Sequence, residues 1–437
     1  MRSIAFLGVM ALLLPMALVR PFVGVLLWCW FSFMNPHRLF WGPVAELPWA
    51  AIIFVVTFAG IILSPEARRA QFNAMSWLVV VFMVGITITS VTALGPPGQV
   101  WAKWDLVFKM CLGLLLTAVL LSDRERIHAL IWVIVISLGY YGVKGGLFTI
   151  AHAGYFRVHG PADSMIGDNN HLAVALLVSI PLMNYLRLQS AHASVRWGLA
   201  AAMPLTLMAA LGSHSRGAFL ALMAGALVFW ARSRGKFVMG AVLAAAVAAG
   251  ISFMPERWEQ RMNTISTYEE DTSATDRLLL WRTAFDLAVD RPLLGVGFRG
   301  PYVREVVDRV NPDAPARAVH SIWFELLAEQ GFVVFLVWLT ILALGAWYAW
   351  KLPRLCRHVP ELSWAIDLGR MALVSIAVYA VGGTFLSLSY WDGFLTLLMA
   401  LAAAHALVRQ AVKQPAHLPR AAVSRARRGF PEQRALT

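Results

Sequence analysis

Residues 75–95 read MSWLVVVFMVGITITSVTALG and contain no charged side chain. A run of this length matches the roughly 20 residues that an α-helix needs to cross a lipid bilayer. Apolar runs of similar length recur along the whole chain, without the alternation of apolar and polar residues that marks the strands of a membrane β-barrel. The sequence therefore predicts an all-α protein built of transmembrane helices.

The composition agrees with this prediction. Of the 437 residues, 59% are hydrophobic and 14% are charged, against about 25% charged in ordinary soluble proteins. Cys29, Cys111 and Cys356 lie in or beside apolar runs without C-x-x-C spacing, which indicates neither a disulfide framework nor a zinc site. A net charge of +13 often indicates a nucleic-acid partner, but in a membrane protein basic residues gather in the loops and tails beside the spans. We therefore expect no nucleic-acid partner.

We expect a polytopic helical bundle of about 12 spans. Its first hydrophobic stretch, residues 4–34, is interrupted by Arg20 and Pro21 and is taken as one broken, retained span, because no A-x-A-type cleavage site follows it cleanly. The other predicted spans lie near residues 48–64, 75–95, 105–121, 127–150, 171–187, 197–212, 217–231, 237–254, 321–347, 366–387 and 390–408.

The distribution of basic residues predicts the orientation. Residues 409–437 form a basic tail, which the positive-inside rule places in the cytoplasm near anionic membrane lipids. Counting back places short basic loops inside, among them those with Arg68, Arg69 and Arg234, and four segments outside: 35–47, 151–170, 213–216 and the long loop 255–320. We therefore expect a multi-pass protein of a bacterial inner membrane, with its active site facing the periplasm, and divide it into a transmembrane region 1–150, a core 151–408 and the tail.

Many arginines lie on the predicted outer side, where the positive-inside rule does not explain them. A guanidinium group matches phosphate oxygens bidentately and keeps its charge, which points to an anionic ligand such as a lipid diphosphate. The alternative for most of them is a lipid headgroup or an acidic residue of the same loop. Arg216 stands out because a charge at the end of a hairpin between two spans is costly unless it faces a cavity. The others are Arg157, Arg257, Arg261, Arg277, Arg282, Arg291, Arg299, Arg304, Arg309 and Arg317.

The long loop has an internal pattern. A helix is predicted to begin near Thr275 and Asp276, and it places Arg277, Trp281 and Ala284 on one face. The segment 291–298, RPLLGVGF, then ends this helix with a proline and two glycines, which suits a tight turn close to other structure or to a ligand.

His320 stands where the loop re-enters the membrane, with Glu325 and Glu329 a few turns below it on the same predicted helix. Histidine is the usual general base near neutral pH, and a neighbouring carboxylate can fix its tautomer. The alternative is an interfacial histidine that caps a helix. The run Glu269-Glu270-Asp271 could hold a divalent cation, but consecutive carboxylates rarely converge on one ion, so we predict no metal and no other cofactor.

Five motifs in this order resemble the O-antigen ligase superfamily, which contains lipopolysaccharide O-antigen ligases, O-linked oligosaccharyltransferases and some O-antigen polymerases. The resemblance covers about residues 165–400, while the N-terminal part resembles ligases associated with exosortase systems. One departure is that this chain has Asp168-Asn169-Asn170 where the family often has Asn-Pro-Asn. The motifs are 167–173 (GDNNHLA), 215–220 (SRGAFL), 277–284 (RLLLWRTA), 291–298 (RPLLGVGF) and His320-Ser321 leading to Glu329-Gln330-Gly331.

This resemblance implies a GT-C-like glycosyltransferase that moves a glycan from undecaprenyl diphosphate to a hydroxyl of the lipid A core, without a metal. Arg216 and Arg277 would hold the diphosphate, and His320 would deprotonate the acceptor. Further substrate contacts are expected from Arg157, Arg282, Arg299, Trp281 and Asn170.

Three other functions remain open at this point. A polymerase or a protein O-oligosaccharyltransferase of the same superfamily would use the same residues on a different acceptor. A transporter is disfavoured, because few ionisable groups lie in the middle of predicted spans, Lys109, Lys144 and Asp392 being the main exceptions.

Overall fold

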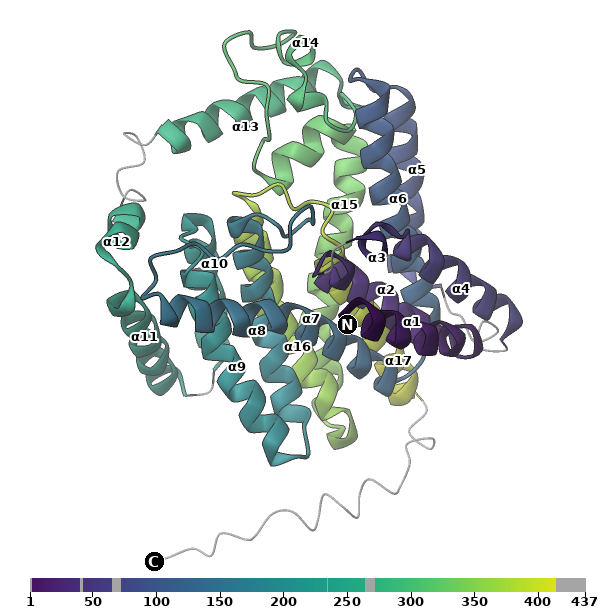
Figure 1. Cartoon of the computed structure of the whole chain (residues 1–437), viewed down its shortest axis with the longest axis vertical. Helices are drawn as coiled ribbons and strands as arrows, with labels where there is room; N and C mark the ends of the chain where they lie inside the picture. The colour runs from purple at the N-terminus through teal and green to yellow at the C-terminus, as the bar shows by residue number, and fades with distance from the viewer. Residues whose placement is uncertain (1, 40–41, 65–71, 234, 264–271, 414–437) are drawn as a thin grey trace, which may run out of the picture.

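The computed structural model describes residues 2–39, 42–64, 72–233, 235–263 and 272–413, and within them the chain forms helices and no strand. Figure 1 shows the helices gathered into one bundle, with the N-terminal helices on one flank and α13 across one end. The predicted all-α class is confirmed for this part of the chain.

Every predicted span is occupied by helix. Residues 4–34 form two helices, because Pro21 lacks an N–H group and begins a new helix after Arg20. The helices in the spans are α1 (Arg2–Val19), α2 (Pro21–Met34), α4 (Trp49–Leu63), α5 (Ala74–Val91), α6 (Pro97–Leu120), α7 (Arg124–Ala151), α8 (Asn169–Gln189), α9 (Ala193–Leu211), α10 (Arg216–Arg232), α11 (Lys236–Phe253), α15 (Ile322–Leu355), α16 (Ser363–Gly383) and α17 (Asp392–Lys413). Short elements among them are η1 (Pro36–Leu39), α3 (Pro43–Glu46) and η4 (Pro360–Leu362).

Eight helices of the described residues are long and apolar enough to cross a membrane. The remaining predicted spans differ from these in length or charge: α1, α2 and α4 are shorter apolar helices, α10 has 17 residues, and α6 carries Lys103, Asp105 and Lys109. The chain thus has many membrane-length helices, while the count of about 12 spans stays a prediction.

Helix α2 connects two hydrophobic cores. Its residues Val25, Cys29 and Phe33 are buried in the main core of the bundle. Its residues Leu27 and Phe31 are buried in a smaller core shared with α1 and α4. Because residues four apart lie on the same side of a helix, each set forms one face of α2, and the N-terminal helices are packed onto the bundle through it.

The described residues of the loop 255–320, 255–263 and 272–320, are largely helical. They contain α12 (Glu256–Asn263), α13 (Thr272–Asp290), η3 (Gly300–Tyr302) and α14 (Arg304–Val307). Ala284 and Leu287 of α13 are buried against Ala328 of α15, so this end of the bundle is covered by packed structure (Figure 1). The predicted loop helix is confirmed.

Several sequence-based predictions fall outside the described residues. They concern the basic loop residues Arg68, Arg69 and Arg234, the acidic run 269–271, and residues 414–437 of the basic tail.

Candidate active site

The turn 291–298 is locked into a break in α15. Gly331 has φ +72° and interrupts that helix. The carbonyl groups of Ala328 and Glu329, just before the break, are therefore available to the turn. Val296 N–H donates to Ala328 O (2.9 Å), Gly297 N–H to Glu329 O (2.8 Å), and Phe332 N–H to Pro292 O (2.8 Å). A Cβ atom on Gly331 would lie 2.8 Å from both Gly295 N and Pro292 O. The predicted close approach of this turn to other structure is confirmed, and it fixes the loop to the base of the site.

His320 has a constrained backbone. It adopts φ +54°, a left-handed conformation that costs a non-glycine residue about 1–3 kcal/mol, and such residues cluster at active sites. The Trp281 indole N–H donates to Val319 O at 3.2 Å, and the Trp281 ring stacks on Phe324 with centroids 5.6 Å apart. Trp281, predicted to contact substrate, therefore supports the backbone that presents His320.

Four arginines from four segments form what we call the arginine cluster: Arg157 before α8, Arg216 at the start of α10, Arg261 on α12 and Arg277 on α13. Partial burial together with Arg157 and Arg216 lowers the pKa of Arg261, and partial burial together with Arg261 lowers the pKa of Arg277. Because a guanidinium stays protonated despite such shifts, the cluster concentrates positive charge at one place.

The turn between α9 and α10 holds part of this cluster. Arg261 Nε donates to His214 O at 2.9 Å, and Asn169 Nδ2 donates to Ser213 O at 2.7 Å. Ser215 Oγ accepts from Ala218 N–H at 3.2 Å and caps α10. The N-terminus of a helix carries partial positive charge and favours anions, so Arg216 and the α10 dipole act in the same direction.

His320 borders the arginine cluster. Its pKa is lowered by partial burial and by the cations Arg277 and Arg317, whereas Asp168 opposes this shift. The imidazole is therefore neutral at pH 7 and can accept a proton. Partial burial raises the pKa of Asp168, but hydrogen bonds from Asn170 and the nearby His171 outweigh it, so the Asp168 carboxylate stays ionised.

Asn170 is engaged with the protein itself. Its Nδ2 donates to Asp168 Oδ1 at 2.9 Å, at the N-terminus of α8. Asp168 and Asn170 together order the segment that faces His320, so a role of Asn170 in substrate binding stays a prediction.

Arg299 and Arg282 differ in their surroundings from the arginine cluster. Arg282 is exposed on α13. Arg299 N–H donates to Glu329 Oε1 at 2.9 Å, its guanidinium lies 4.7 Å from the centre of the Tyr302 ring, and Tyr390 O–H donates to Glu329 Oε2 at 2.8 Å. We call Glu325, Glu329, Tyr302 and Tyr390 the carboxylate cluster, and Arg299 belongs with it.

Other loop arginines are paired with acids. Arg317 lies 2.6 Å from Asp276 and Arg309 lies 3.0 Å from Asp290, and Arg304 pairs with Asp308. The alternative considered for most outer arginines, pairing within the loop, is confirmed for these three.

Sequence reasoning did not single out Arg261, Asp168 or Lys103. Arg261 was one loop arginine among many, and only its place on α12 brings it to the turn 213–216. Lys103 was placed before a predicted span starting at residue 105, whereas α6 begins at Pro97 and carries Lys103 within the bundle, 5.2 Å from the centre of the Tyr390 ring. The sequence feature that could have indicated this position is the placement of Lys103 between Trp101 and Trp104.

No three histidine, cysteine, aspartate or glutamate side chains of the described residues form a group that could hold a metal ion. The arginine cluster supplies the fixed positive charge at this place.

Two family models match the chain. Residues 1–191 match a family of unknown function, DUF5935, and this matched region extends to the end of α8. Residues 201–339 match the O-antigen ligase family and include α10, α13, the turn 291–298 and His320. No curated protein matches the chain. Residues 201–339, which carry Arg216, Arg277 and His320, are an O-antigen ligase domain, and this match supports the assignment to the O-antigen ligase superfamily.

Proposed function

We propose that this protein is an inverting, metal-independent glycosyltransferase that moves an O-antigen glycan from undecaprenyl diphosphate to a sugar hydroxyl of the lipid A core. The reaction would take place on the periplasmic face of a bacterial inner membrane. The family assignment supports glycosyl transfer in general. The observation that carries the specific proposal is the position of His320, a neutral base, at the edge of a cluster of arginines.

The arginine cluster suits a diphosphate leaving group. As the bond between the anomeric carbon and the diphosphate oxygen breaks, negative charge grows on that oxygen. Arg216, Arg261 and Arg277 are already held together by α10, α12 and α13, so they stabilise this charge without reorganising. A diphosphate stabilised in this way departs without a proton from a general acid.

His320 suits the acceptor. A sugar hydroxyl is a weak nucleophile, and its proton must pass to a base as its oxygen bonds to the anomeric carbon. The neutral His320 imidazole accepts that proton, and the Asp168 carboxylate favours the imidazolium that forms. The acceptor oxygen attacks opposite the leaving diphosphate, so one displacement inverts the anomeric configuration. His320 then returns the proton to solvent.

The test is product analysis with the reconstituted full-length protein, undecaprenyl-diphosphate-linked glycan and rough lipopolysaccharide. The proposal predicts glycan on the lipid A core with inverted anomeric configuration. Retention of configuration would exclude the single displacement. Extension of the lipid-linked donor in place of core transfer would assign the protein as a polymerase, and glycan found only on protein would assign an O-oligosaccharyltransferase.

A further inference from the structure

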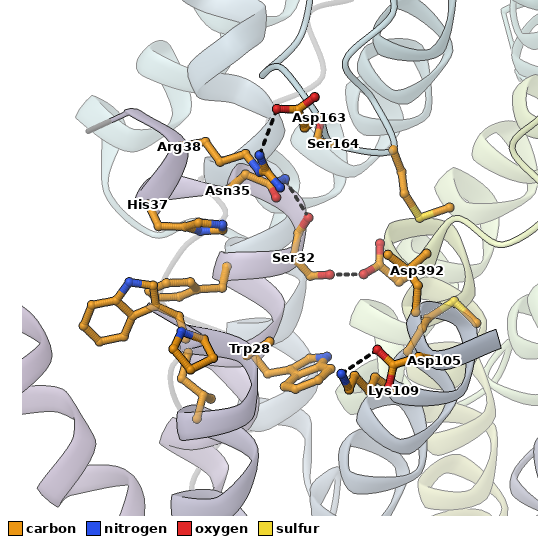
Figure 2. A pocket seen from close by; sticks show the side chains of 18 of the residues that line it. Trp28, Ser32, Asn35, His37, Arg38, Asp105, Lys109, Asp163, Ser164 and Asp392 are labelled. Carbon is orange, nitrogen blue, oxygen red and sulfur yellow. Dashed lines mark hydrogen bonds and ion pairs between the residues drawn. The ribbon is translucent and has the colours of Figure 1, made fainter. Parts of the chain in front are cut away.

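A second hollow lies outside the arginine cluster, in the part of the chain that matches the family of unknown function. It is a cavity of about 420 Å³ between α2, α4 and α6, within the range of small-molecule sites. Figure 2 shows Trp28, Ser32, Asn35 and His37 on one side of it and Asp105, Lys109 and Asp392 on the other. We call it the N-terminal cavity.

The polar groups of the N-terminal cavity favour a ligand rich in hydroxyl groups. The Ser32 hydroxyl donates to Asp392 Oδ2, and Asp392 is 8% exposed. A carboxylate has about four acceptor positions. Besides Ser32, the backbone N–H groups of Asp392 and Gly393 donate to Asp392, so one position remains for a hydrogen bond from a ligand. The Asn35 amide, which donates to Ser32 O at 3.0 Å, adds acceptor capacity nearby.

The charges of the cavity disfavour an anion. Both cations that line it are matched by acids: Lys109 lies 2.6 Å from Asp105, and Arg38 lies 3.2 Å from Asp163. Asp392 adds a third carboxylate. Partial burial and the adjacent Arg38 lower the pKa of His37, so its ring is neutral at pH 7. With more carboxylates than cations, the cavity repels phosphate and acidic sugars.

The apolar part of the lining is aromatic. Trp28, Phe31 and Trp49 line the cavity together with Leu47 and Ile53. The face of an aromatic ring packs against the C–H face of a sugar ring, while carboxylates and amides bind the hydroxyl groups at its edge. An acyl chain would instead place methylene groups against Asp392 and the Asp105–Lys109 pair and exclude the water that solvates them, at a cost in free energy.

Three segments contribute to both the cavity and the candidate active site. Residues 163–165 line the cavity, and Asp168 three residues later acts on His320. Asp392 lines the cavity, and Tyr390 two residues earlier donates to Glu329. Lys103 lies on the ring of Tyr390, while its neighbour Ala102 lines the cavity. The cavity and the candidate active site are therefore connected through three short stretches of chain.

We propose that the N-terminal cavity binds an uncharged sugar residue, stacked on Trp28 and hydrogen-bonded to Asp392. The lining alone argues for a sugar; the proposed function adds only that the sugar belongs to one of the two glycans that reach the active site. Those glycans are the core of the acceptor and the repeat unit of the donor.

The experiment measures binding of two lipid-free, dephosphorylated oligosaccharides to the full-length protein in nanodiscs by ligand-observed NMR. One is an outer-core oligosaccharide of rough lipopolysaccharide without acidic sugars, and the other is the repeat-unit oligosaccharide. Wild type is expected to bind one of them. Asp392→Asn, which keeps the shape and removes the charge, is expected to weaken binding about tenfold or more.

The controls separate this role from a structural one. Ser32→Ala removes the hydrogen bond between α2 and α17 but keeps the carboxylate, so binding should persist. Trp28→Ala removes the proposed stacking surface and should weaken binding. If this variant does not fold, Asp105→Asn at the half-exposed ion pair is a second lining variant with an expected loss of affinity. His320→Ala should bind the oligosaccharide as wild type does.

The inference is overturned if neither neutral oligosaccharide binds, if Asp392→Asn binds as wild type does, if an acidic oligosaccharide binds better, or if phosphatidylethanolamine in the nanodisc displaces the sugar. If wild type transfers no glycan but still binds a neutral sugar in a manner that depends on Asp392, the proposed function fails and this site stands.

Discussion

The arginine cluster and the carboxylate cluster are two polar groupings of the candidate active-site region, and they are built differently. Glu329 is fully buried, and both of its carboxylate oxygens accept hydrogen bonds from the protein. In the arginine cluster, partly buried cations from separate segments lower one another's pKa. Hydrogen-bonded groups such as those around Glu329 hold a structure together, whereas cations gathered from separate segments create a positive potential that attracts an anionic ligand. We therefore expect the carboxylate cluster to act mainly on structure and the arginine cluster to act in the chemistry.

The largest effect is expected at His320. The variant His320→Ala should lose about 10²- to 10⁴-fold in transfer rate, the usual contribution of a general base. Binding of the lipid-linked donor should be retained, because the arginines are intact. Rates from the reconstituted transfer assay, with donor affinity measured separately, check this; transfer at the wild-type rate would remove His320 from the mechanism.

Arg216→Ala should slow transfer by about 10²- to 10³-fold, as loss of one donor to a developing anion does. Its thermal midpoint without donor should change little, because the Arg216 side chain is only partly buried at the start of α10. Differential scanning fluorimetry beside the transfer assay measures both quantities. A fall in stability that parallels the loss of activity would mean that Arg216 is structural.

At Gly331 we expect a loss of stability, in contrast to the loss of activity expected at Arg216. The variant Gly331→Ala places a Cβ atom 2.8 Å from backbone atoms of the turn 291–298 and forces an alanine into φ +72°. Strain of this kind costs about 1–3 kcal/mol, so the thermal midpoint should fall clearly. Gly235→Ala is the matched control, because a Cβ atom there meets nothing within 4 Å. Equal midpoints for the two variants would contradict the interlocked turn.

The smallest expected effect is a shift in pH dependence. Because the pKa of His320 is lowered, the neutral base is present at and above neutral pH, and kcat/KM should fall only on acidification, with its inflection below 6.5. Arg277→Gln removes a nearby cation and should move the inflection up, whereas Asp168→Asn removes a nearby anion and should move it down. The pH profiles of the three proteins check these signs, and shifts in the reverse directions would place another group in control.

The approximate positions of the membrane-length helices followed from hydrophobicity, because a membrane-length apolar run has few alternatives to helix. The break between α1 and α2 and the tight turn at 291–298 were visible because proline and glycine restrict the backbone in known ways. His320, Arg216 and Arg277 came from motifs that the superfamily shares.

Contacts between distant segments were not predictable in the same way. Arg261 joins the site only because α12 packs under the turn 213–216, and no spacing along the sequence encodes that packing. Arg299 was grouped with the other arginines because its type matched, whereas its backbone N–H and its ring contact belong to the carboxylate cluster. The N-terminal cavity gathers residues from positions 28 to 392, a combination that only the folded chain reveals.

The most direct test of the account compares Arg277→Ala with Arg282→Ala in the reconstituted transfer assay, in the presence of EDTA. The two arginines lie five residues apart on α13, one in the arginine cluster and one exposed. The account predicts that wild type keeps its rate with the chelator present, while Arg277→Ala loses about 10²-fold or more and Arg282→Ala, outside the arginine cluster, loses much less. Loss of wild-type activity in EDTA, or equal rates for the two variants, would contradict it.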